Sequence, residues 1–108
     1  MKMSDELLKQ ATDAHRNDKL DEAERLYRSI LKTNPKQLNA NHNLGLIVVS
    51  FGKVEEALSY LKIALMNDTK NEQFWLSYVQ ALISNKNNQE ANALLLVCQK
   101  SKIQRGRV

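Results

Sequence analysis

The stretch NHNLGLIVVSFGKVEEALSYLKIA, residues 41–64, holds two segments of helical apolar spacing separated by a break at Phe51-Gly52. Its Glu56-Ala57 pair recurs 34 residues earlier as Glu22-Ala23 and 34 residues later as Glu90-Ala91. Three copies of a 34-residue unit therefore fill the chain, at residues 4–37, 38–71 and 72–105.

Other columns of the same alignment also hold similar side chains. The residue four places after each alanine is Tyr27, Leu61 or Leu95. Gly45 stands where the two helices of one copy would pass closest, so a larger side chain there would push them apart. We expect each copy to be a pair of helices whose apolar face only a neighbouring pair can cover.

This pattern resembles the tetratricopeptide repeat (TPR), a helix-turn-helix unit with the pattern W-x2-L-G-x2-Y, then A-x3-F-x2-A, then P. The middle copy matches it most fully, and the copies depart from it at Gln10, Val79, Thr69 and Ile103. The matching residues are Ala23, Tyr27 and Pro35, then Leu44, Gly45, Ala57, Leu61 and Ala64, then Trp75, Ala91 and Leu95. The resemblance implies an all-α fold, an α-solenoid of three TPR repeats with six antiparallel helices in a right-handed superhelix.

The register predicts helices near 4–17, 20–33, 37–50, 54–67, 71–85 and 88–104. Asn17-Asp18 and Phe51-Gly52 close the first helix of their copies, since Asp, Asn and Gly tolerate a left-handed turn. Asn34-Pro35 ends a second helix, and Asn71 is expected to cap the helix that follows it.

The composition fits a single domain over residues 1–108. No apolar run reaches the roughly 18 residues needed to span a membrane, and the first residues lack the order of a signal peptide. We therefore expect a cytoplasmic protein without a membrane partner. Cys98 is the only cysteine, which excludes an internal disulfide, and its column predicts a place in the core.

The net charge of +4 comes from the C-terminal end of the chain. The basic tail, residues 100–108, holds four of the 16 Lys and Arg side chains, and the other 12 equal the 12 acidic ones in number. Cations near a helix end favour the negative pole of its dipole. We prefer that interpretation to phosphate binding and predict no nucleic-acid partner.

Residues that could perform catalysis do not cluster in this sequence. The two histidines are isolated, no Cys or carboxylate group has metal-ligand spacing, and no glycine-rich phosphate loop is present. We predict a non-catalytic protein without a cofactor or a metal.

The TPR resemblance places the function on a surface. In that family the first helices of successive repeats line a concave groove that receives a peptide or a partner's helix. Carried over to this chain, the peptide groove would be lined by Leu8, Thr12, Asn39, His42, Asn43, Leu46, Gln73, Leu76, Ser77 and Gln80. These side chains are mostly amide, hydroxyl or aliphatic, and a groove of this kind can also simply be solvated.

Chaperone-binding TPR domains grip a terminal carboxylate with Lys, Asn, Asn, Lys and Arg. The corresponding positions here are Leu8, Thr12, Asn43, Gln73 and Ser77, of which only Asn43 agrees. Without the two Lys and the Arg the carboxylate would lack its charge-assisted partners, so we predict no role of that kind.

The last predicted helix differs from its predecessors because residues 93–97 are all apolar. Self-association is one explanation, and it would give a homodimer with Ala93, Leu96, Val97 and Lys100 at the contact. The alternative is that the chain is an N-terminal accessory domain cut from a larger bacterial glycosyltransferase or sulfotransferase. Both readings make the chain a scaffold for protein–protein interaction rather than an enzyme.

Overall fold

The computed structural model describes residues 2–85 of the chain, and this part is entirely helical. It contains α1 (Lys2–Arg16), α2 (Leu20–Thr33), α3 (Leu38–Ser50), α4 (Val54–Asn67) and α5 (Glu72–Ser84). The all-α solenoid fold is confirmed, and these bounds lie within two residues of the predicted ones. The sixth expected helix, 88–104, lies outside the described residues. None of the five helices is both long and apolar enough to cross a membrane.

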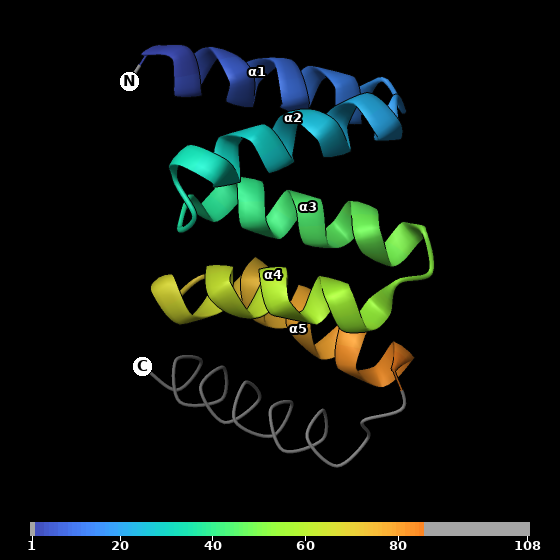
Figure 1. Ribbon diagram of the computed structural model, residues 1–108. Helices are drawn as coiled ribbons and strands as arrows, with labels where there is room; N and C mark the ends of the chain where they lie inside the picture. Colours follow the sequence, from blue (N-terminus) through green and yellow to red (C-terminus); the bar gives the residue numbers. More distant parts are fainter. Residues whose placement is uncertain (1, 86–108) are drawn as a thin grey trace.

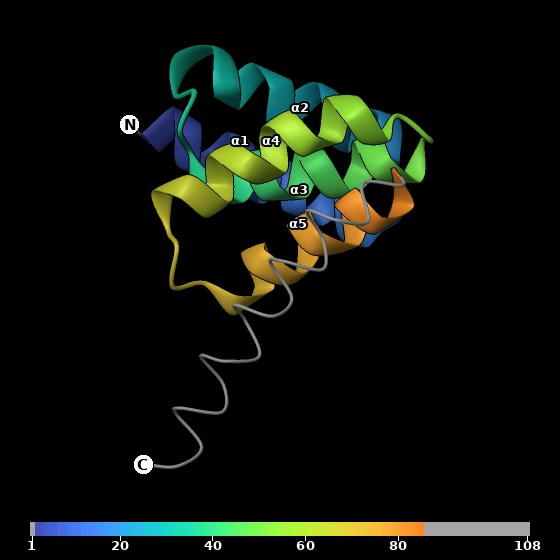
Figure 2. The same cartoon turned by 90° about the horizontal axis from the view of Figure 1, so that it is seen from below.

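Consecutive helices run antiparallel and stack in the order of the sequence (Figure 1). Each helix packs against the next one along the chain, and α3 also contacts α5 directly. Figure 2 shows α2 and α4 together on one side of the stack and α3 and α5 on the other. The first helices of the repeats and the second helices therefore form separate layers.

The 34-residue period is also visible in how the helices begin and end. Asp18 and Gly52, which are 34 residues apart, both adopt the left-handed conformation, with φ of 63° and 82°. At the next equivalent pair, the side chains of Gln37 and Asn71 accept hydrogen bonds from the backbone N–H groups of Ala40 and Phe74. Asn71 is thus confirmed as a helix cap, and the predicted turn at Asn17-Asp18 is confirmed as well.

Asn41 and Trp75 occupy equivalent positions and fasten equivalent loops. Asn41 Nδ2 donates to the carbonyl oxygen of Pro35 at 2.9 Å, and Trp75 Nε1 donates to the carbonyl oxygen of Thr69 at 2.6 Å. Two unlike side chains therefore satisfy the same backbone group in successive repeats, because each carries an N–H donor at the same place.

The core contains a close helix crossing at Gly45, as the sequence predicts. A Cβ atom added to Gly45 would lie 2.6 Å from Leu61 Cδ2 and 2.7 Å from its Cγ. Leu61 is only 1% exposed, so it has little room to move away. The absence of a side chain at Gly45 is what allows α3 and α4 to pack at this distance.

Candidate functional site

The solvent-facing side of α5 carries a stripe of uncharged residues. Gln73, Leu76, Gln80 and Ile83 follow one another at spacings of three or four, so they share one side of the helix. All four are exposed, and the two aliphatic side chains are 38% and 47% exposed. The stripe is notable because large aliphatic side chains are more often buried.

The helix beside it, α3, carries a similar stripe. Asn39 is exposed, and Asn43, Leu46 and Val49 are partly exposed. None of the residues of α3 is charged, and the only charged residue of α5 is Glu72. We call the eight residues of the two stripes the α3–α5 surface: Asn39, Asn43, Leu46, Val49, Gln73, Leu76, Gln80 and Ile83.

His42 and Ser77 hold the two helices together beneath this surface. His42 Nε2 lies 2.7 Å from Ser77 Oγ, and the imidazole ring packs on Phe74 with 4.8 Å between ring centroids. His42 is 7% exposed and Ser77 is 3% exposed. Removal of the imidazole from water lowers the pKa of His42, so the ring is held in its neutral form at neutral pH.

The surface continues toward α1 through Leu8 and Thr12, which are both partly exposed. Asn43 is tied to the first repeat, because its Nδ2 donates to the hydroxyl oxygen of Tyr27 at 3.1 Å. The ring of Tyr27 is fully buried and meets His15 edge to face, with 6.3 Å between centroids. This contact holds one amide of the surface in a fixed orientation.

The structure therefore separates the predicted groove residues into two groups. Eight are exposed or partly exposed on α1, α3 and α5, whereas His42 and Ser77 are buried and bonded to each other. These two can support a surface but present almost no area to a ligand. The residues predicted for self-association, Ala93, Leu96, Val97 and Lys100, lie outside the described residues, as do Cys98 and the basic tail.

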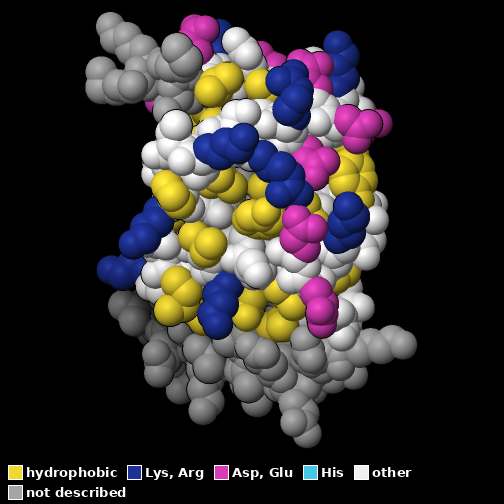
Figure 3. Space-filling model, in the orientation of Figure 1, with side chains coloured by type: hydrophobic (Ala, Val, Ile, Leu, Met, Phe, Trp, Pro, Cys, Tyr) yellow, Lys and Arg dark blue, Asp and Glu magenta, His cyan; other side chains and the backbone are white. Residues whose placement is uncertain are grey.

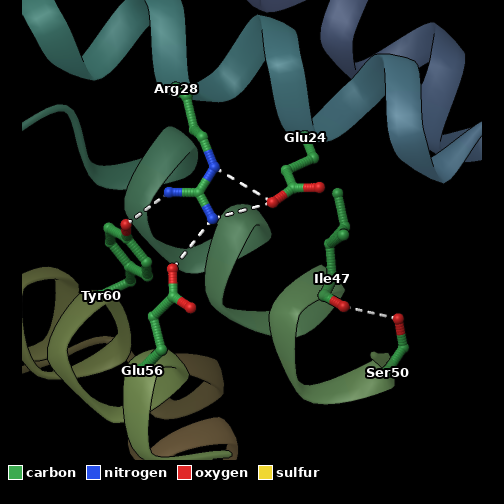
Figure 4. Close-up of polar contacts among 6 residues, drawn as sticks. All are labelled: Glu24, Arg28, Ile47, Ser50, Glu56 and Tyr60. Atoms are coloured by element: carbon green, nitrogen blue, oxygen red, sulfur yellow. Dashed lines mark hydrogen bonds and ion pairs between the residues drawn. The ribbon is translucent and has the colours of Figure 1, made fainter. Parts of the chain in front are cut away.

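The opposite layer contains a charged cluster that the sequence analysis missed. Arg28 on α2 donates to Glu24 Oε2 at 2.8 Å, to Glu56 Oε2 on α4 at 2.9 Å, and to the Tyr60 hydroxyl at 2.8 Å (Figure 4). The bonds to Glu56 and Glu24 raise the pKa of Arg28 above its usual range. The spacing of Glu24 and Arg28, four residues apart on one helix, is the signal that could have revealed part of it.

Figure 3 shows the face of the molecule over α2 and α4, where Lys and Arg side chains alternate with Asp and Glu around hydrophobic ones. The charged residues of the second helices thus contrast with the uncharged α3–α5 surface. Among residues 2–85 no group of three His, Cys, Asp or Glu side chains could hold a metal ion.

Comparison with known proteins identifies the repeat. The family model for the tetratricopeptide repeat matches residues 8–72, which is 65 of the 108 residues. The chain belongs to the tetratricopeptide repeat family. None of the curated proteins compared with this TPR chain matches it.

Solved structures of other TPR proteins resemble the chain in fold. The translocator chaperone SycD of Yersinia enterocolitica, in complex with a peptide of YopD, has a TM-score of 0.83 at 16% identity, covering 93% of this chain and 76% of that one. The Sgt2 TPR domain of Aspergillus fumigatus has a TM-score of 0.77 at 20% identity and 87% coverage of this chain. The matching region spans 62% of that Sgt2 chain and 51% of the MamA chain, another similar structure.

Proposed function

We propose that this TPR chain is a non-catalytic module that binds a partner protein along the concave side of its first helices, α1, α3 and α5. The observation that carries this proposal is the α3–α5 surface, where aliphatic and amide side chains are exposed together without charge. The TPR fold adds support, because a similar structure, SycD, holds a peptide. We place this interaction in the cytoplasm.

The polar side chains of the surface are suited to a polypeptide ligand. The amides of Asn39, Gln73 and Gln80 each offer both donors and an acceptor, as the backbone of a peptide does. All three are exposed, so they exchange bonds with water until a ligand replaces it. A peptide backbone laid across α3 and α5 can therefore be bound without desolvating an unpaired charge.

Selection of short random peptides on the immobilised chain tests the proposal. We expect peptides that bind the wild-type chain and whose affinity changes at least about fivefold, in either direction, in Gln80→Arg. Ser59→Arg is the matched control, since Ser59 is an exposed position of α4. The proposal fails if no peptide is enriched, or if both variants change the affinity alike.

We also propose that the chain forms a homodimer through the apolar segment 93–97. The support is the sequence alone, in which this segment carries apolar residues where the equivalent positions of earlier repeats hold Arg28 and Lys62 or Arg25 and Ser59. Light scattering measures the molar mass directly. A mass of about 25 kDa, twice 12.4 kDa, is expected for a two-fold dimer, and 12.4 kDa at all concentrations would contradict it.

A further inference from the structure

The exposed aliphatic side chains of α5 bear on which kind of ligand the surface takes, an inference that rests on the proposed function. Leu76 and Ile83 are seven residues apart, which places them on one side of the helix and roughly 10 Å apart along its axis. They are among the four large hydrophobic side chains most exposed in the described part of the chain, at 38% and 47%. Two such contacts on one rigid helix form a pair of fixed anchor points.

Charge distribution distinguishes this surface from the rest of the molecule. α2 carries charged residues at six positions, Asp21, Glu22, Glu24, Arg25, Arg28 and Lys32, whereas α3 carries none. A charged side chain of a ligand that docked on α3 and α5 would lose water and gain no opposite charge. The surface therefore selects against charged ligands, including a terminal carboxylate, which needs charge-assisted donors.

The support beneath the surface is rigid and uncharged as well. The buried bond between His42 and Ser77 joins α3 to α5, so the stripes of the two helices keep one relative position. Leu46 and Val49, which are partly exposed on α3, extend the aliphatic area beside Leu76 and Ile83. A ligand segment can thus meet aliphatic side chains on two helices at once.

We propose that the ligand is an uncharged segment of a partner protein whose aliphatic side chains contact Leu76 and Ile83, with the amides of Gln73 and Gln80 bonding to its polar groups. The surface lies away from the exposed aliphatic Met66, which is 64% exposed on α4 and belongs to the opposite layer. Met66 therefore provides a control for exposed hydrophobic area as such.

The composition of peptides selected from a random library tests this inference. We expect the enriched peptides to hold at least two aliphatic residues within a stretch free of Asp, Glu, Lys and Arg. Their affinity should fall at least about tenfold in the double variant Leu76→Ser, Ile83→Ser and stay unchanged in Met66→Ser. Fluorescence polarisation with a labelled synthetic copy of one selected peptide gives the affinities, and circular dichroism confirms that both variants remain helical.

The outcomes separate this inference from the function it rests on. Enrichment of charged peptides that bind through the inner helices would overturn the uncharged ligand and leave the binding function standing. Uncharged peptides that bind the double variant as tightly as the wild type would remove Leu76 and Ile83 as anchors. Failure to enrich any peptide would overturn both proposals.

Discussion

At Gly45 a single missing side chain sets the distance between two helices. Replacement by leucine adds atoms where even a Cβ would lie 2.6 Å from Leu61 Cδ2. Leucine gains about 1 kcal/mol of helix propensity over glycine, but overpacking of a core costs about 1–3 kcal/mol and sometimes more. We expect Gly45→Leu to lower the free energy of unfolding by at least about 1 kcal/mol in urea denaturation. Lys70→Ala, an exposed change, is the control, and equal midpoints would contradict the packing argument.

The two left-handed turn residues should respond oppositely to substitution. Asp18 has a Cβ that disfavours its φ of 63°, whereas Gly52 at φ 82° has none. We expect Asp18→Gly to raise the free energy of unfolding by about 0.5–1 kcal/mol, and Gly52→Ala to lower it by about 1 kcal/mol. Nothing lies within 4 Å of a Cβ built on Gly52, so steric contact cannot cause that loss. Thermal denaturation measures both, and changes of the same sign would contradict the shared turn.

His42 makes the stability of the chain depend on pH. Burial lowers its pKa below the ordinary value of 6.5, so the unfolded chain binds a proton more readily than the folded one. His42 therefore has no unfavourable effect above pH 6.5, and the free energy of unfolding falls as the pH drops from 6.5 toward the lower, folded pKa. Titration of the His42 ring by NMR should give a midpoint below 6.5. His15→Gln should leave that midpoint unchanged, and a midpoint of 6.5 or higher would contradict the buried neutral ring.

At the scale of elements, Arg28 connects two helices that are not neighbours in sequence. It joins α2 to Glu56 and Tyr60 of α4, so one side chain ties together the second helices of successive repeats (Figure 4). The guanidinium is suited to this role because its planar fork of N–H groups can meet several acceptors at once. Part of the cluster is open to water, which limits the contribution of each ion pair.

Substitution of Arg28 by methionine should therefore have a moderate effect that depends on salt. We expect Arg28→Met to lower the free energy of unfolding by about 1 kcal/mol, since it leaves two carboxylates near each other without their cation. The difference from wild type should shrink at about 1 M salt, where exposed charges are screened. Arg25→Met, which removes the same charge from an exposed position of α2, is the control. An equal loss in both variants would mean that net charge, rather than the cluster, is responsible.

At the scale of the whole molecule, the repeats contact one another in order along the stack, and their surfaces divide by layer. Buried polar contacts join the first repeat to the second through Tyr27 and Asn43, and the second to the third through His42 and Ser77. Stability is therefore shared between neighbouring repeats rather than held by one central core. The charged second-helix layer and the uncharged α3–α5 surface follow from the same arrangement.

The proposed dimer is the prediction that belongs to this scale. Leu96→Glu places a carboxylate in the apolar segment 93–97, and a charge at the centre of an interface strongly disfavours association. We expect this variant to be monomeric by light scattering under conditions where the wild-type chain is a dimer. Met66→Glu adds the same charge to the exposed face of α4 and should leave the dimer intact. Persistence of the dimer in Leu96→Glu would place the contact elsewhere.

The sequence by itself determined the helices, the 34-residue register, the turns at Asp18 and Gly52 and the close crossing at Gly45. These features depend on local spacing and on residue size, which repeat along the chain. It also placed eight of the ten groove residues on accessible parts of the first helices.

Only the tertiary structure decided which equivalent residues are buried and which are exposed. His42 and Leu76 are 34 residues apart, yet His42 is 7% exposed and Leu76 is 38% exposed. The difference arises because α5 sets Ser77 and Phe74 against His42, and these contacts depend on side chains of the next repeat. Arg28 likewise finds Glu56 and Tyr60 across the layer. A periodic pattern predicts where a side chain lies on its helix, but its partners belong to a neighbouring repeat whose residues are not copies of its own.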